Sequence, residues 1–336
     1  MVSHDLLAQA AEILRSGGLV AFPTETVYGL GADAYNPLAL AKVFEVKARP
    51  HFDPLIIHIA SIDTLEIAAN LSLLSEESRL NLSRLAENLW PGPLSIVLPK
   101  SDKISSLATA GLPTAAFRFP DHEIAQKLIS LSSGAVAAPS ANPFGSLSPT
   151  KAEHVRNKLG DKIDMILDGG STRVGLESTV LDITGDCIKI LRPGGTPKEV
   201  IESLVGPVQI INKDEIVDKD LRGHTAPGQL KSHYAPKMPL FALDRKEIVR
   251  QPYKNGDVFL FFDSLTKDEW VSSQNPPNSA VIRVLSEAGN LPEAASRLFE
   301  TLHELENCNI MRIYAQFAPA EGLGEAINDR LRRAST

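Results

Sequence analysis

The sequence predicts an α/β protein with two domains. Apolar residues recur first at helical spacing and then in short strand-like runs, and this alternation continues along most of the 336 residues. Hydrophobic residues make up 43% of the chain and charged residues 22%, which is ordinary for a globular protein with a sizeable core and excludes general disorder. A Gly- and Pro-rich stretch after residue 206 interrupts the pattern, so we expect one domain on each side of it.

The first domain opens with a helix and a buried strand. Leu6 to Leu14 carry apolar residues at helical spacing up to Gly17 and Gly18, and residues 19–22 form an apolar run. Asn36 and Pro37 begin a second helix. Further strands are expected at 55–59, 94–98, 115–119, 135–137, 165–168, 178–183 and 188–192. Because some of these runs are too close together for an intervening helix, we expect a twisted, mixed sheet rather than a purely parallel one.

The second domain repeats the α/β pattern on a smaller scale. Strands are expected at 240–243, 257–262, 280–283 and 311–314, and helices at 291–305 and 324–333. We therefore predict a first domain over 1–206, a linker over 207–239 and a smaller Rossmann-like α/β domain over 240–336.

Charge and cysteine content exclude several classes of protein. The net charge is −7, with −4 in residues 1–200 and −3 in the remainder, so no part is a basic domain suited to strong nucleic-acid binding. Cys187 and Cys308 form neither a disulfide framework nor a zinc motif. The N-terminal segment lacks the features of a secretory signal, and no apolar run approaches the ~18 residues of a membrane span. We expect a soluble, cytoplasmic protein.

The densest cluster of polar residues is the segment 23–31, which follows the first predicted strand. Strand ends are where α/β sheets bind ligands. Gly29, Gly31 and Ala34 superficially match a dinucleotide fingerprint, but Pro23 through Thr26 stand between the strand and the match, and the helix starts too late. We therefore interpret the glycines as a turn.

Cations and hydroxyls gather near other predicted strand ends. Lys47 and Arg49 stand before a proline, and alone they are best explained as a helix C-terminal cap. Arg118, Arg192 and Ser140, however, also follow apolar runs, and such a set suits a phosphate-bearing ligand. The sequence contains no P-loop, HExxH or G-x-S-x-G motif, so the familiar NTPase, metalloprotease and serine hydrolase classes are disfavoured.

Six segments, taken in order, resemble the YrdC-domain family, and the chain is similar to its two-domain threonylcarbamoyl-AMP synthases. The similarity extends from about residue 17 to residue 192 and continues into the linker at Pro227-Gly228 and residues 233–236. The segments that carry it are 23–30, 47–50, 54–58, 138–142, 176–180 and 191–194.

The resemblance implies an ATP-dependent condensation. L-Threonine and bicarbonate would react with ATP to give threonylcarbamoyl-AMP and pyrophosphate, the first step of threonylcarbamoyladenosine formation in tRNA, and other proteins would transfer the group to tRNA. Mg2+ would accompany ATP. Catalysis would come from positioning and charge neutralisation, without a catalytic residue distinct from the binding set.

The same resemblance implies two sets of binding residues and no protein metal ligand. The threonine set is Thr26, His58, Arg118 and Ser178 with the backbone at Ala138, which lacks the hydroxyl of many relatives. The ATP set is Lys47, Arg49, Asp53, Thr114, Ser140, Ser148, Arg192 and Tyr234, with Tyr234 closing the site from the linker.

Five of these assignments have a structural alternative. Thr26 could cap a turn, Asp53 could begin a strand, Thr114 could be an ordinary sheet residue, Ser148 could mark a helix start, and His58 could be a partly buried core histidine.

Two other functions remain open from the sequence. One is a double-stranded RNA-binding or translation-associated module, which the charge of the first domain disfavours. The other is carbamoyl adenylation for a different acceptor, but the chain has no room for the additional modules of such proteins.

Overall fold

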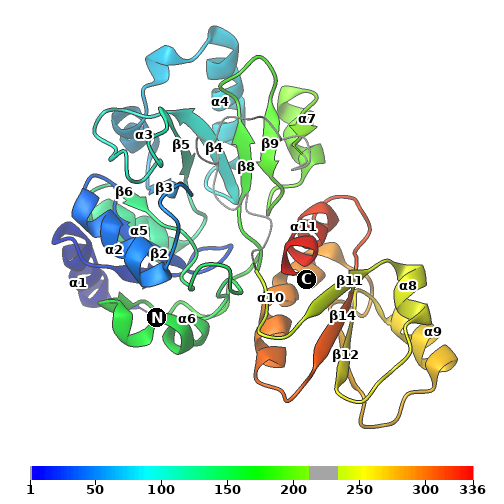
Figure 1. Cartoon of the computed structure of the whole chain (residues 1–336). Coiled ribbons are helices and arrows are strands. Elements are labelled where there is room, and N and C mark those ends of the chain that lie inside the picture. The colour runs from blue at the N-terminus through cyan, green and yellow to red at the C-terminus, as the bar shows by residue number, and fades with distance from the viewer. Residues whose placement is uncertain (1, 212–233, 336) are drawn as a thin grey trace. The chain divides into compact units, whose positions relative to one another are not determined.

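The computed structural model describes residues 2–211 and 234–335 and separates them into two compact units (Figure 1). The first unit takes in Met1–Phe144, Pro149–Arg173 and the described part of Glu177–Gln229. The second contains Gly145–Ser148, Val174–Leu176 and the described part of Leu230–Thr336. The predicted linker over 207–239 lies largely outside the described residues, including Pro227, Gly228 and His233, and the domain boundaries stay predictions.

The first unit is built on one mixed sheet of ten strands in the order β10-β9-β8-β4-β5-β3-β6-β2-β1-β7. β3 and β5 are parallel, as are β4 and β8, whereas β4 and β5 are antiparallel. The expected mixed sheet is thus confirmed. Its strands are β1 (Val20–Phe22), β2 (Gly29–Asp33), β3 (Ile56–Ile59), β4 (Leu94–Pro99), β5 (Thr114–Arg118), β6 (Ala135–Ala137), β7 (Met165–Ile166), β8 (Thr179–Asp182), β9 (Lys189–Arg192) and β10 (Gln209–Ile210).

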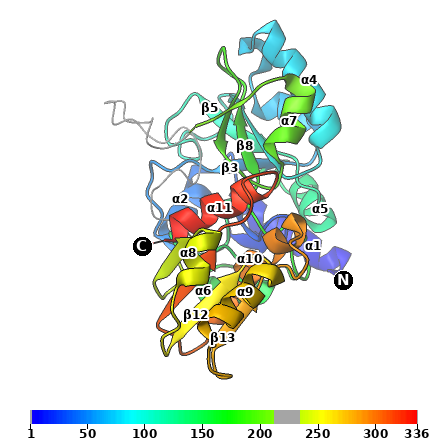
Figure 2. The same cartoon turned by 90° about the vertical axis from the view of Figure 1, so that its right-hand side faces the viewer.

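Helices of the first unit supply cores to both faces of this sheet. α1 and α5 pack on one face through Leu7, Leu14 and Leu128, while α2 and α4 contribute to the larger core on the other face. Figure 2 shows α4 and α7 side by side. The helices are α1 (His4–Arg15), α2 (Pro37–Lys47), α3 (Ile62–Ala68), α4 (Glu76–Leu89), α5 (Glu123–Leu131), α6 (Ala152–Leu159) and α7 (Lys198–Val205), with short 3₁₀ turns at Leu71–Leu73 and Gly160–Lys162.

The interpretation of Gly29 and Gly31 as a turn was wrong, because both residues belong to β2. This strand pairs with β1 in an antiparallel arrangement, with Val20 opposite Gly31. A Cβ atom on Gly31 would lie 2.8 Å from the Phe22 ring and 3.0 Å from Val136. Glycine therefore serves here to admit a neighbouring side chain, not to make a turn.

The second unit contains a four-stranded parallel sheet in the order β11-β14-β12-β13. In Figure 1 its strands lie between α8 and α9 on one side and α10 and α11 on the other. The strands are β11 (Leu240–Leu243), β12 (Asp257–Phe261), β13 (Val281–Val284) and β14 (Arg312–Gln316), and the helices are α8 (Arg245–Arg250), α9 (Ser264–Gln274), α10 (Leu291–Glu306) and α11 (Gly324–Ala334). This arrangement confirms the expected smaller α/β domain.

In the described ranges 2–211 and 234–335, no helix has the length and apolar character that crossing a bilayer requires.

Candidate active site

One face of the large sheet carries a row of polar residues beside a small apolar cluster. The cluster consists of Ile56, Val97, Ala116, Val180 and Leu191. Since alternate residues of a strand share a face, His58 lies on the side of Ile56, and Thr114 and Arg118 lie on the side of Ala116. His58 and Arg118 are direct partners across β3 and β5. The candidate site therefore occupies a sheet face as well as strand ends.

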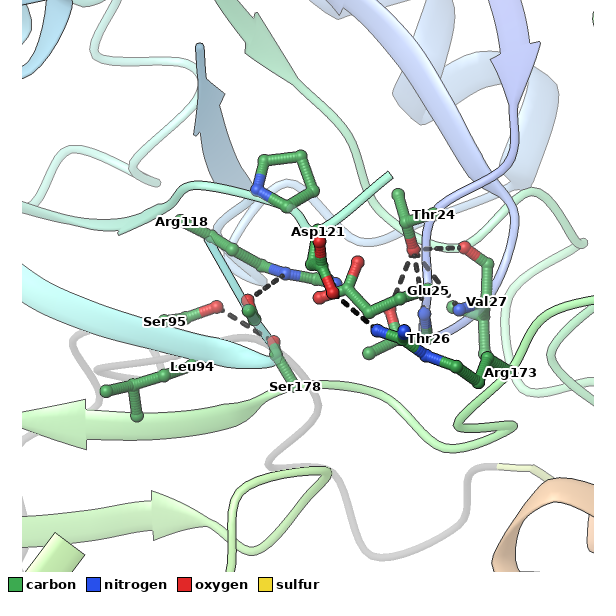
Figure 3. A network of polar contacts seen from close by, with 12 residues as sticks. Thr24, Glu25, Thr26, Val27, Leu94, Ser95, Arg118, Asp121, Arg173 and Ser178 are labelled. Atoms are coloured by element: carbon green, nitrogen blue, oxygen red, sulfur yellow. Dashed lines mark hydrogen bonds and ion pairs between the residues drawn. The ribbon is translucent and has the colours of Figure 1, made fainter. Parts of the chain in front are cut away.

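Arg118, at the end of β5, forms a buried ion pair with Glu25. Its Nη2 atom lies 2.7 Å from Glu25 Oε1, and its Nε atom donates to the Gly92 carbonyl oxygen at 3.3 Å (Figure 3). Both side chains are less than 5% exposed. A buried guanidinium is a bidentate partner for a carboxylate, as expected of the residue predicted to hold the threonine carboxylate.

Ser178 and Arg192 lie next to each other, just before β8 and at the end of β9. Arg192 Nη2 donates to the Ser178 carbonyl oxygen at 2.8 Å and to its hydroxyl at 3.2 Å. The Ser178 hydroxyl also lies 2.8 Å from that of Ser95 in β4, as Figure 3 shows. A residue predicted to bind threonine is thus in direct contact with one predicted to bind ATP.

His58 is buried and electrically neutral. Burial, together with the nearby positive charge of Arg118, lowers the pKa of His58 to about 3. Within the described residues its Nδ1 atom has no hydrogen-bond partner. The ring also meets the backbone of Ile56 and Val136, so the structure holds it as a core histidine while leaving Nδ1 for a ligand.

Thr26 belongs to a tight loop between β1 and β2. The Thr24 hydroxyl accepts hydrogen bonds from the backbone N–H groups of Thr26 and Val27, and it lies 2.8 Å from the Thr26 hydroxyl. Thr24, rather than Thr26, organises this turn. Ala138 follows β6, and its N–H donates to the Ile56 carbonyl oxygen at 2.9 Å, which places it beside the start of β3.

Lys47 reaches away from the helix that it ends. Its Nζ donates to the carbonyl oxygens of Ser140, at 2.6 Å, and Asn142. Burial, followed by repulsion from Arg49, lowers the pKa of Lys47 well below its usual value, with Asp53 partly opposing this. These contacts contradict the helix-cap interpretation of Lys47 and bring two predicted ATP residues together.

Arg49 and Asp53 form a second buried ion pair, with Nη2 and Oδ2 2.8 Å apart. Arg49 also donates to the backbone oxygens of Asp53 and Pro54, and its guanidinium lies 6.0 Å from the centre of the Phe144 ring. Asp53 does not begin a strand, because β3 starts at Ile56.

The three remaining predicted ATP residues are Thr114 in the first unit and Ser148 and Tyr234 in the second. Thr114 begins β5, four residues before Arg118, so about 13 Å of strand separates them. In the second unit, the Ser148 carbonyl oxygen lies 2.9 Å from His303 Nε2. Tyr234 is 1% exposed and packs against Phe299 and Arg330 of the same unit. Ser148 is not a helix start, since α6 begins at Ala152.

Two residues of the site were missed from the sequence. Glu25 stands inside the segment 23–30, and its acidic side chain in an otherwise uncharged run was an available signal. Ser95 gave none, because a single serine in a strand is unremarkable in sequence. As a whole, the face offers cations, hydroxyls and a neutral imidazole, which together suit an amino acid and a phosphate-bearing ligand.

Comparison with known proteins gives two family matches in succession. Residues 12–194 match the family described as "Telomere recombination", and residues 196–336 match "Threonylcarbamoyl-AMP synthase, C-terminal domain". The chain belongs to the threonylcarbamoyl-AMP synthase family. Its activity is threonylcarbamoyl-AMP synthesis, a nucleotidyl transfer that uses ATP and is the first step of threonylcarbamoyladenosine modification of tRNA.

Individual threonylcarbamoyl-AMP synthases resemble the chain over nearly its whole length. The protein of Pyrococcus abyssi is 42% identical over 97% of this chain and 93% of its own, and that of Bacillus subtilis is 39% identical over 98% and 92%. A crystal structure of P. abyssi Sua5 complexed with L-threonine has a TM-score of 0.87 and 39% identity, covering 100% of this chain and 95% of that one. The predicted family membership is confirmed, and L-threonine is a ligand of the P. abyssi relative.

Proposed function

We propose that the sheet face described above binds L-threonine next to the phosphates of ATP. The observation that carries the proposal is the contact between Arg192 and Ser178, because it joins the two predicted binding sets at one position. Arg118 would hold the threonine carboxylate, while Thr26, Ser178 and neutral His58 would contact its remaining polar atoms. Ala138 would contribute only backbone groups.

ATP would be held by the cations and polar groups of the other set. Lys47 and Arg192 would neutralise phosphate charge, and Arg49, Asp53, Ser140 and Thr114 would contact phosphates or polar edges. Ser148 and Tyr234, described within the second unit, stay predictions of ATP contact. A bound phosphate would favour the charged form of Lys47 and so oppose the effect of burial on its pKa.

Mg2+ would enter with ATP. Among the residues described in the structure, no group of three His, Cys, Asp or Glu side chains could hold a metal ion. Phosphate oxygens and water commonly supply most Mg2+ ligands, so this side-chain set fits a metal carried by the nucleotide. When bound, Mg2+ would withdraw charge from the phosphates.

The reaction would proceed by bringing two anions together. The threonine amine would combine with bicarbonate to form a carbamate, whose oxygen would attack the α-phosphorus of ATP and release pyrophosphate. Buried cations lower the repulsion between carbamate and phosphate. Binding both reactants in fixed positions also removes the entropy cost of bringing them together during the reaction. The activated product would pass to separate transfer proteins, which act on tRNA.

Pyrophosphate release tests the proposal. We expect release from ATP to require both L-threonine and bicarbonate, measured by a coupled phosphate assay in bicarbonate-depleted buffer with each reactant restored in turn. Release without threonine, or without bicarbonate, would contradict the proposed condensation.

A further inference from the structure

Glu25 has more hydrogen-bonding capacity than its surroundings use. It is 2% exposed, and its only recorded ion-pair partner among the described residues is Arg118. Within residues 2–211 and 234–335, neither carboxylate oxygen accepts a hydrogen bond of normal geometry. Arg118 Nη2 likewise donates none of normal geometry there. An ionised carboxylate can accept about four hydrogen bonds, and leaving them unmade in a buried place is costly.

The other buried ion pair of the site is held differently. Arg49 is fixed by its own loop, since it donates to the backbone oxygens of Asp53 and Pro54 as well as pairing with the Asp53 carboxylate. Among the described residues, Arg118 donates one hydrogen bond from its side chain, at 3.3 Å to the Gly92 carbonyl oxygen, beside its contact with Glu25. The Glu25–Arg118 pair is therefore the less satisfied of the two, as expected of groups that await a partner.

Free threonine matches this pair in charge and spacing. Its carboxylate and ammonium are attached to one carbon atom, so its opposite charges are as close together as the 2.7 Å pair of Arg118 and Glu25. If Arg118 binds the threonine carboxylate, the ammonium would lie beside Glu25. The two side chains and the two ligand groups would then form a closed arrangement of alternating positive and negative charges. The predicted threonine set of Thr26, His58 and Ser178 supplies hydroxyls and a neutral ring but no anion for an ammonium.

We propose that Glu25 binds the ammonium group of L-threonine and takes its proton before carbamate formation. This proposal rests on the placement of the threonine carboxylate at Arg118 in the proposed function. It assigns to Glu25 a role in substrate binding and in the chemical step, in addition to its ion pair with Arg118.

The proton balance of the reaction calls for such a group. The ammonium gives one proton to the Glu25 carboxylate, leaving a free amine and a carboxylic acid. The amine nitrogen then forms a bond to the carbon of bicarbonate, one C–O bond breaks, and carbamate and water result. Attack of the carbamate on ATP forms the new P–O bond and releases pyrophosphate. One proton remains on Glu25 and must leave before the next cycle.

A cavity beside Glu25 provides a route for that proton. Its volume is about 870 Å³, and Glu25 lines it together with Asp121, His122, Asp168 and Arg173. Within the described residues His122 Nδ1 has no hydrogen-bond partner, and burial lowers the pKa of this ring. A neutral imidazole can accept a proton and pass it on.

The remaining charged groups near Glu25 are already paired or lie at the surface. Arg173 pairs with Asp121, and Glu123 pairs with Lys127. Arg118 is the cation in direct contact. The proton would therefore pass from Glu25 to His122 and from there into the cavity, without passing Arg118.

Ligand discrimination tests the binding role. Titration calorimetry would compare L-threonine with (2S,3R)-2,3-dihydroxybutanoate, in which a hydroxyl replaces the amine. We expect Glu25→Gln to lower the affinity for threonine by about 10- to 100-fold, the range for loss of a charge-assisted bond. The affinity for the hydroxy acid should change less than about twofold. Equal weakening of both ligands would reduce Glu25 to a support for Arg118, and unchanged threonine affinity would place the amine elsewhere.

Kinetics test the proton transfer. At saturating threonine, pyrophosphate release by Glu25→Gln should rise about tenfold per pH unit from pH 7 to 9, because free amine must then come from solution, while the unsubstituted enzyme changes little. A purely structural role would give parallel profiles. Glu123→Gln is the matched control, since this exposed residue lines the same cavity and should leave affinity and profile unchanged.

A measurement on the unsubstituted protein covers the case in which Glu25→Gln does not fold. Threonine binding is followed in buffers of different ionisation enthalpy at pH 7.5. Retention of the ammonium proton by Glu25 gives no proton release to buffer, whereas release of about one proton per threonine would overturn the proposal. Failure of the unsubstituted protein to bind threonine at all would instead contradict the proposed function.

Discussion

The buried, neutral His58 ring makes the first unit sensitive to acid. The unfolded chain protonates this residue below its ordinary pKa of 6.5, whereas the folded chain does so only near 3. The associated stability is fully present above pH 6.5 and is lost as the pH falls towards 3. At pH 5 the unfolded chain is protonated at His58 and the folded chain is not, and the pH lies about 1.5 units below the unfolded pKa. At about 1.36 kcal/mol per unit, the free energy of unfolding is therefore lowered by about 2 kcal/mol. We expect His58→Gln to remove that part of the pH dependence.

Urea unfolding at pH 7 and pH 5 measures the effect. The chain has two tryptophans, Trp90 in the first unit and Trp270 in the second, so a Trp270→Phe background leaves fluorescence that reports the first unit alone. In this background the loss of unfolding free energy between pH 7 and pH 5 should be about 2 kcal/mol smaller with His58→Gln than without it. The exposed His4→Gln substitution serves as the control. An equal loss with and without His58 would refute the reasoning.

Three further predictions concern separate parts of the first unit. Arg118→Ala should weaken threonine by about 10- to 100-fold and leave ATP affinity unchanged in calorimetry, and the reverse result would contradict the division of the site. ATP binding should raise the lowered pKa of Lys47, because phosphate favours its charged form, and proton uptake on ATP binding, measured by calorimetry in two buffers, should be smaller in Lys47→Met. Gly31→Ala should destabilise the unit by about 1–3 kcal/mol in Trp90-monitored unfolding, because its Cβ would lie 2.8 Å from the Phe22 ring. Gly185→Ala, in open space, should change stability by less than about 0.5 kcal/mol, and equal losses would exclude crowding as the cause.

Apolar runs were sufficient to locate most strands of both units. The run from Leu94 to Leu98 and that from Ala115 to Phe119 each coincide with an observed strand to within one residue at either end, because buried strands need continuous apolar sequence. β2 escaped detection because its glycines carry no side chain to reveal the alternation. Two helices of the second unit were also not specified, although Asp244 and Glu247 form a capping box that marks the start of α8.

The site was predictable as a set of residue types but not as a set of contacts. Motif resemblance named Arg118 and Ser178, yet neither spacing nor composition indicates that Glu25 pairs with the first or Ser95 with the second. Both contacts join residues more than 80 positions apart: Ser95 and Ser178 meet because β4 and β8 are neighbours, whereas Glu25 reaches Arg118 from the loop between β1 and β2. The strand order follows from packing across the whole unit, which a local pattern does not encode.

The contact between Ser148 and His303 has a consequence for how the protein is made. The two residues are 155 positions apart, and both belong to the second unit. At translation rates of about 5–20 residues per second, His303 is added roughly 8–30 s after Ser148. Throughout that interval the segment Gly145–Ser148 has been synthesised without the helix that it will contact. The nascent chain must therefore carry an unfinished loop, and the second unit can close only near the end of synthesis.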